Sequence, residues 1–76
     1  MITGIQIRSA RHALRWSVAH LGKVSGVSTS TIKRVEAEDS VPNCTKPNAE
    51  ALKKVFEDAG IEFIGTPEDA PGVRLH

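Results

Sequence analysis

The stretch SVAHLGKVSGVSTSTIKRVE, residues 17–36, contains the same helix start signal twice. Ser17 and Ser28 each precede a run without proline, and a serine at that position accepts a hydrogen bond from the backbone of the first helical turn. An apolar residue stands before each serine and another stands four residues after it, as in a hydrophobic staple. The stretch therefore predicts two helices, over residues 18–24 and 29–37.

Gly26 lies between these two predicted helices. Glycine readily adopts a left-handed backbone, which closes one helix and turns the chain into the next. Leu21, Ile32 and Val35 have the spacing that turns them toward a common core. Two short helices joined by a tight glycine turn form a helix-turn-helix when they cross steeply.

A further helix is predicted near the N-terminus, over residues 4–15. Thr3 and Gln6 have the spacing of a capping box, in which each side chain bonds the backbone of the other residue. Ile7 and Leu14 lie on one face of this helix at helical spacing. The same kind of start signal therefore opens three helices in the first half of the chain.

The chain changes character after the third helix. Residues 38–47 are rich in acids, Asn and Pro, which predicts a loop. A fourth helix is expected to start at Thr45 or Asn48 and to end at Ala59, because its apolar residues recur at helical spacing.

The last residues alternate apolar and polar side chains. Residues 61–64 and 72–76 show this alternation around a turn-forming segment, so we expect two short antiparallel strands. The expected fold class is all-α with four to five helices and a short C-terminal β-strand pair. Residues 1–60 would form the helical domain, and residues 61–76 an extension packed on it or used in dimerisation. We expect a homodimer through the fourth helix and the strands, because the strands carry apolar side chains that need cover: Ile61, Phe63, Val73 and Leu75.

Composition narrows the class of protein. The chain has 76 residues, which suits one domain, and its single cysteine has no internal disulfide partner. It shows neither a membrane-length apolar run nor a signal-peptide layout, so we expect a cytoplasmic protein. Residues 1–35 contain six cations and no acid, whereas residues 36–76 contain four cations and nine acids. This split suggests that the first half faces a polyanion.

The sequence gives no pattern for catalysis or metal binding. Cys44 falls in a polar loop, and His12 and His20 are far from it in sequence, unlike the short spacings of zinc ligands. A phosphate-binding glycine loop is also missing. We therefore expect no enzyme, no cofactor and no metal, and we assign Trp16 to the core.

The stretch LRWSVAHLGKVSGVSTSTIKRVEAED, residues 14–39, resembles the phage-repressor and Cro-like helix-turn-helix regulators of the XRE family. The resemblance extends over residues 2–65. It implies a small lambda-repressor-like DNA-binding domain that binds double-stranded DNA as a homodimer, with half-sites roughly 34 Å apart. The positions that match the family pattern are Ser17, Leu21, Gly26, Val27, Ser28, Ile32 and Glu36.

The resemblance also implies that the helix over residues 29–37 enters the major groove. There, Ser and Thr hydroxyls hydrogen-bond base edges, a Thr methyl contacts a thymine methyl, and Lys33 and Arg34 reach base acceptors or phosphates. It further implies that Arg11 pairs with Glu36. The residues expected at the DNA are Ser17, Lys23, Ser28, Thr29, Ser30, Lys33 and Arg34.

Three residues depart from the family pattern. Val18 replaces a Gln that touches the DNA backbone, and His20 replaces the Glu that would complete a capping box with Ser17. Gly22 replaces a tightly packed Ala, at a cost of about 0.5–1 kcal/mol in helix propensity.

The expected function is a sequence-specific transcriptional regulator that acts as a repressor. Two alternatives stay open. One is an antitoxin that represses its own operon and binds a toxin. The other is an adaptor that binds a protein partner and keeps the fold without contacting DNA, which Val18 and the acidic second half favour. Only DNA binding through several phosphates should weaken steeply as salt rises.

Overall fold

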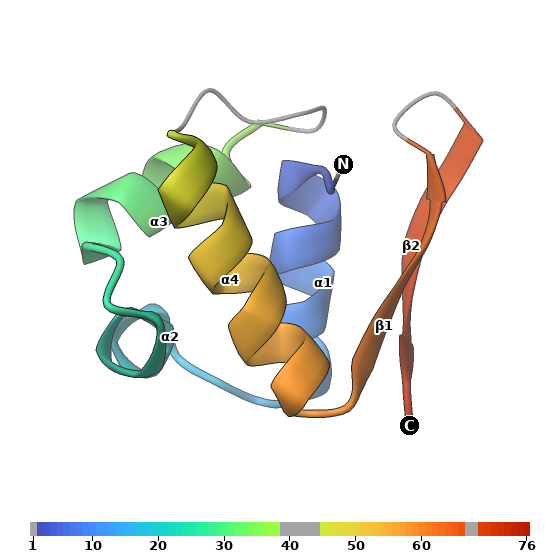
Figure 1. Cartoon of the computed structure of the whole chain (residues 1–76), viewed down its shortest axis with the longest axis horizontal. Coiled ribbons are helices and arrows are strands. Elements are labelled where there is room, and N and C mark those ends of the chain that lie inside the picture. Colours follow the sequence, from blue (N-terminus) through green and yellow to red (C-terminus); the bar gives the residue numbers. More distant parts are fainter. Residues whose placement is uncertain (1, 39–44, 67–68) are drawn as a thin grey trace.

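The computed structural model describes residues 2–38, 45–66 and 69–76. The described part is a small, mostly helical fold with a two-stranded antiparallel sheet, which stands beside α1 and α4 and away from α2 and α3 (Figure 1). The elements in chain order are α1 (Gly4–Ala13), α2 (Val18–Ser25), α3 (Thr29–Glu36), α4 (Lys46–Asp58), β1 (Ile61–Thr66) and β2 (Asp69–Leu75).

All the helix starts expected from hydroxyl residues are confirmed. Thr3, Ser17, Ser28 and Thr45 are the N-caps of the four helices, and each side chain accepts a hydrogen bond from the backbone N–H three residues on. The capping box is complete, because the backbone N–H of Thr3 also donates to Oε1 of Gln6 at 2.8 Å. These bonds satisfy N–H groups that a helix start leaves without partners.

The predicted end of the first helix is wrong. The helix ends at Ala13 instead of residue 15, and Arg15 has a left-handed backbone with φ of 57°. The Trp16 N–H turns back and donates to the Arg11 carbonyl oxygen at 2.9 Å. The other helices end within one residue of prediction, at Ser25, Glu36 and Asp58 instead of residues 24, 37 and 59.

The core lies where the four helices meet. Side chains from every helix contribute, and those that are completely buried include Ile7, Leu21, Ile32, Leu52 and Phe56. Each such side chain removed from water stabilises the fold by roughly 1.5–3 kcal/mol.

An aromatic row extends the core toward the strands. Trp16 stacks on Phe56 with ring centroids 5.7 Å apart, and Phe56 meets the edge of Phe63 at 6.1 Å. The row joins the α1–α2 connection to α4 and to β1. Trp16 is only half-buried, but it packs against the core as expected.

The expected antiparallel strand pair is confirmed, and both strands are longer than predicted. β1 reaches Thr66 and β2 begins at Asp69, because an irregularity in the pairing after Ile64 lets the strands continue into the turn-forming segment. Gly65 supplies the left-handed backbone there, with φ of 78°.

The apolar side chains of the strands are covered by the protein's own helices. Ile61 is buried, and Phe63 and Val73 pack against the core; only Leu75 stays exposed, at 53%. The helical domain therefore covers three of the four side chains, and the homodimer expected through the fourth helix and the strands stays a prediction.

Gln6 fastens the hairpin to α1. Its side-chain amide donates to the carbonyl oxygens of Ile64 at 2.9 Å and Gly72 at 2.8 Å, which belong to paired residues of the two strands. The residue is only 2% exposed, so both bonds are shielded from water. One side chain therefore caps α1 with its oxygen and holds both strands with its nitrogen.

Some expectations fall outside the described residues. They are most of the loop predicted over residues 38–47, including Cys44, and the connection at residues 67–68. Within the described ranges, no helix is long and apolar enough to cross a membrane, and no group of His, Cys, Asp or Glu side chains is placed to hold a metal ion.

Candidate nucleic-acid interface

The connection between α2 and α3 is a tight turn at Gly26. This residue has φ of 74°, and its N–H closes α2 by donating to the Gly22 carbonyl oxygen at 2.9 Å. Val27 follows and is buried, while its N–H donates to Oγ of Ser25 at 3.1 Å. The N–H groups of Gly26 and Val27 are thus both satisfied within the turn, and the apolar side chain of Val27 packs between the two helices.

The α3 helix has one buried and one exposed side. Ile32, Val35 and Glu36 are buried. The solvent side carries four of the residues that the sequence predicts at the DNA, which are Thr29, Ser30, Lys33 and Arg34. At helical spacing these four form one continuous strip of hydroxyl and cationic groups.

The side chains of the four consecutive hydroxyl residues, 28–31, differ in their hydrogen bonds. Oγ of Ser28 accepts from the Thr31 N–H at 3.2 Å and lies 2.9 Å from Oγ1 of Thr31, to which it donates. These two hydroxyl groups thus satisfy each other. Within the described residues the side chain of Ser30 has no hydrogen-bond partner, and its hydroxyl group is exposed to solvent.

Thr29 is partly engaged by the neighbouring helix. A Cβ added to Gly22 would lie 3.2 Å from Cγ2 of Thr29 and 3.1 Å from the Val27 carbonyl oxygen. The Thr29 methyl therefore lies close to the space above Gly22, where α2 and α3 meet. From the sequence, Gly22 was only expected to lower helix propensity. The structure shows that its lack of a side chain also lets α3 approach α2 closely.

The charged residues among those expected at the DNA are all cations. Lys23 on α2 and Lys33 and Arg34 on α3 are exposed, and in the ranges that the structure describes none of them forms an ion pair. Ser17 is also exposed, at the start of α2, with its hydroxyl accepting from the His20 N–H at 3.0 Å. The expected site residues thus fall into one cluster, from Ser28 to Arg34, and two positions at the ends of α2.

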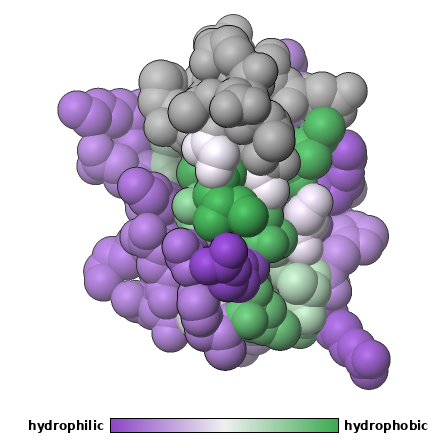
Figure 2. Space-filling model, turned by 90° about the vertical axis from the view of Figure 1, so that its right-hand side faces the viewer, coloured by the Kyte–Doolittle hydropathy of each residue, from purple (hydrophilic) through white to green (hydrophobic). Residues whose placement is uncertain are grey.

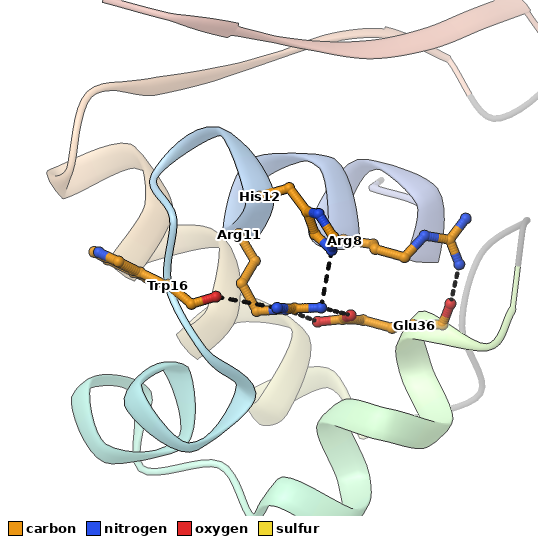
Figure 3. A network of polar contacts seen from close by, with 5 residues as sticks. All are labelled: Arg8, Arg11, His12, Trp16 and Glu36. Atoms are coloured by element: carbon orange, nitrogen blue, oxygen red, sulfur yellow. Dashed lines mark hydrogen bonds and ion pairs between the residues drawn. The ribbon is translucent and has the colours of Figure 1, made fainter.

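Arg11 and Glu36 form the expected ion pair between α1 and α3 (Figure 3). Nε of Arg11 donates to Oε2 at 2.9 Å, and Nη2 donates to Oε1 at 2.8 Å. A planar guanidinium bound through two parallel hydrogen bonds has a defined orientation. The hydrogen bonding to Glu36 raises the pKa of Arg11 above its already high usual value.

Further contacts extend this pair into a network that the sequence did not reveal (Figure 3). Nη1 of Arg11 donates to the Trp16 carbonyl oxygen at 3.0 Å, just before α2, and Nη2 lies 3.2 Å from Nε2 of His12. Arg8 donates to the Glu36 carbonyl oxygen at 2.7 Å. This last bond satisfies a carbonyl at the end of α3, where helices leave such groups unpaired.

Gly4 brings the start of α1 against the end of α3. A Cβ at this position would collide with the carbonyl oxygens of Val35 and Glu38. A larger residue there would force the two helices apart. In the sequence Gly4 looks like an ordinary first helical residue, and only the tertiary packing shows why a side chain is excluded.

Val18 and His20 both differ from the pattern of the family that the sequence resembles. Val18 is half-buried and packs against the core, so it turns away from the outer surface of α2. His20 is exposed and meets the edge of Trp16, with ring centroids 4.9 Å apart. Neither side chain belongs to the cationic surface.

Chemically, the exposed strip of α3 offers hydrogen-bond donors and acceptors together with positive charge, on a helix whose position is fixed by buried contacts. It holds no carboxylate, because the only acid of α3, Glu36, is buried and paired. No protein-family model, curated protein or solved structure matches this chain.

Proposed function

We propose that this chain is a sequence-specific, double-stranded DNA-binding regulator that inserts α3 into the major groove, with α2 and α3 as its helix-turn-helix. The observation that carries the proposal is the exposed strip of α3, where Ser30, Lys33 and Arg34 lack partners within the described residues. A helix with small side chains at its N-terminal end fits the major groove and brings its donors to the base edges.

The chemistry of the strip divides its residues into two roles. Arg34 has the guanidinium fork that binds O6 and N7 of guanine, and Ser30 and the hydroxyl of Thr29 are suited to base edges nearer the helix start. Lys33 and Lys23 supply positive charge for phosphates, which gives affinity without sequence information. Ser28 contributes through the helix cap instead of through a base, because its hydroxyl already bonds Thr31.

Rigidity supports the same proposal. Reading a base edge requires side chains held close to one geometry, and sites on fixed helices meet that demand best. Two hydrogen bonds join Arg11 to Glu36, and Arg8 bonds the last turn of α3. Together these bonds fix α3 against α1. Occupation of an operator by this domain would exclude other proteins from the same DNA, and such exclusion is repression.

The test is selection of binding sites from a random double-stranded DNA library with the purified protein at moderate salt. The proposal expects enrichment of a defined sequence, and that sequence should lose its advantage when Arg34 is replaced by alanine. A folded protein that enriches no sequence would overturn it.

Salt dependence separates DNA binding from a protein-binding adaptor. The association constant for the selected site should fall along a straight line as salt rises on logarithmic axes, with a slope set by the number of phosphates contacted. Replacing Lys23 or Lys33 by alanine should reduce the slope by about one phosphate each. A flat salt dependence would favour the adaptor.

A further inference from the structure

Arg15 closes α1 in a backbone conformation that suits glycine. Its N–H donates to the His12 carbonyl oxygen at 3.0 Å, and the N–H of Trp16 donates to the Arg11 carbonyl oxygen at 2.9 Å. These two bonds form a Schellman motif, in which Arg15 holds the left-handed position with φ of 57°. Glycine is usual at that position, because a Cβ there comes too close to the following carbonyl oxygen. Arg15 is therefore held in a conformation that costs free energy.

The chain uses glycine for the same conformation at other helix ends. Gly26 closes α2 with φ of 74°, and Gly60 follows the end of α4 with φ of 94°. Among the described residues, Arg15 is the only one other than glycine with a positive φ. Residues held in such conformations concentrate at functional sites. The cost at Arg15 therefore points to a use for its side chain.

Neither packing nor ion pairing accounts for this side chain. Arg15 is exposed, and in the ranges that the structure describes its guanidinium forms no hydrogen bond and no ion pair. No acid precedes Glu36 in the sequence, and both carboxylate oxygens of Glu36 accept from Arg11. The donors of the Arg15 guanidinium are thus free for an anion from outside the chain, and their planar fork matches the oxygens of a phosphate group.

The connection that contains Arg15 leads to the proposed DNA-binding helices. Arg15 stands two residues before Ser17, the N-cap of α2. The connection runs from α1 to α2 and away from the hairpin (Figure 1). The hairpin side of the molecule instead shows a strip of apolar surface between hydrophilic areas (Figure 2). Lys23 follows Ser17 by about 9 Å along the helix axis, so cations stand at both ends of α2.

We propose that Arg15 binds a phosphate group of the DNA backbone beside the bases that α3 reads. This contact rests on the proposed function, since it belongs to the same interface. Arg15 and Lys23, at the two ends of α2, would bind different phosphates of the duplex. Such contacts fix the orientation of a protein on DNA and carry no information about the base sequence. The left-handed arginine thus trades stability of the free protein for affinity.

Two substitutions of Arg15 separate the backbone from the side chain. Arg15→Gly relieves the left-handed conformation, so Tm of the free protein should rise by about 2–8 °C. Arg15→Ala also removes the guanidinium but keeps a Cβ in that conformation, so Tm should not rise. Thermal unfolding of the full chain without DNA measures both changes.

Binding to the duplex selected by the wild-type protein tests the phosphate contact. Arg15→Gly and Arg15→Ala should lower the association constant equally, by about five- to tenfold at roughly 0.1 M salt, and reduce the salt slope by about one phosphate. The loss should be the same on duplexes with single base changes, and Arg15→Lys should retain most of the affinity. Lys53→Ala, which removes an exposed cation of α4, is the control and should leave the association constant unchanged.

Methylphosphonate substitution locates the phosphate. Neutralising one phosphate of the duplex at a time should reveal a position that weakens binding of the wild-type protein and does not affect Arg15→Gly. A folded wild-type protein that binds no duplex would overturn the proposed function together with this contact. Wild-type binding with an equal affinity for Arg15→Gly, or with the same methylphosphonate profile for both proteins, would overturn only the role of Arg15. A Tm of Arg15→Gly no higher than that of the wild type would overturn the cost assigned to the turn.

Discussion

Arg11 and Glu36, 25 positions apart in sequence, share two hydrogen bonds that join α1 to the last turn of α3. Their side chains are only 15% and 8% exposed. A pair withdrawn from water in this way contributes little net stability, but losing one partner leaves the other charge uncompensated. The pair therefore acts mainly on where α3 lies, and its removal should be costly.

The first prediction concerns this pair. Glu36→Ala should lower the free energy of unfolding by about 3–5 kcal/mol, because the Arg11 guanidinium would stay shielded from water without its carboxylate. Arg11→Lys should also destabilise, since an ammonium group does not reproduce the two parallel bonds. Urea unfolding followed by circular dichroism measures both changes.

The matched control is the exposed pair of α4. Nζ of Lys54 lies 3.2 Å from Oδ2 of Asp58, and the two side chains are 77% and 67% exposed. Asp58→Ala should change stability by no more than about 0.5 kcal/mol, as is usual for a solvated pair in one helix. Equal effects at Glu36 and Asp58 would show that the buried network does not hold α3.

The second prediction concerns Gln6. Gln6→Ala leaves the carbonyl oxygens of Ile64 and Gly72 without their donor and should cost about 1–3 kcal/mol. The loss should be local, so amide hydrogens of β1 and β2 should exchange faster while those of α4 change less. Hydrogen exchange followed by NMR shows where protection is lost.

Gln6→Glu is the sharper variant. It keeps an oxygen that can accept from the Thr3 N–H and removes only the NH₂ group that donates to the strands. At neutral pH the carboxylate would face two carbonyl oxygens, so the hairpin should be freed while the N-cap of α1 is kept. Unchanged protection of the strands in this variant would contradict the role assigned to the amide.

The third prediction ranks two glycines. Gly4→Ala should cost about 1–3 kcal/mol, because its Cβ meets backbone atoms that move only if the helices separate. Gly22→Ala should change stability by less than about 1 kcal/mol, since a gain in helix propensity offsets the crowding. Thermal unfolding of both variants tests the order, and a greater loss at Gly22 would reverse it.

The fourth prediction concerns DNA binding by α3. Arg34→Ala should weaken binding to the selected site by about 1–3 kcal/mol and relax the preference for one base pair, as expected for an arginine that reads guanine. Lys53→Ala is the control, because it removes one exposed cation from α4 instead of α3. Fluorescence anisotropy with labelled duplexes measures the affinity of both variants. Equal losses of affinity would show that Arg34 contributes only its positive charge and reads no base.

The fifth prediction concerns pH. A hydrogen bond with His76, followed by the charge of Arg74, lowers the pKa of Glu62 below its ordinary 4.5. A lowered pKa in the folded protein means that ionised Glu62 stabilises the hairpin fully above 4.5. This contribution is lost as the pH falls through the lower, folded value.

NMR titration of the side-chain carboxyl carbon of Glu62 measures this shift directly. His76→Ala should return the pKa of Glu62 toward 4.5, because the bond of 2.6 Å to Nε2 of His76 is its largest cause. Titration at 4.5 in the unaltered protein would contradict the prediction.

Local chemistry in the sequence was enough to predict where the helices begin. Thr3, Ser17, Ser28 and Thr45 each bond a backbone group only three residues away, so the signal and the structure lie in the same short segment. The pairing of Arg11 with Glu36 came from a resemblance instead, because no local pattern links residues so far apart.

What the sequence could not predict depends on contacts between distant residues. Arg15 carries no sign that it would adopt the left-handed backbone that ends α1 early. Gln6 was identified as half of a capping box, but its donors reach carbonyls 58 and 66 positions away. The close approach of the Thr29 methyl to Gly22 likewise depends on how α2 and α3 pack.

The bonds from Gln6 to the strands also bear on the order of folding. Helical turns close through contacts between near neighbours, which form quickly, whereas the amide of Gln6 gains both of its acceptors, Ile64 and Gly72, only when the hairpin is complete and docked. Until then the amide of Gln6 would bond water at the place where β1 and β2 later arrive. Docking of the hairpin is therefore expected to be the last step, and the one during which the nascent protein is most open to association with other chains.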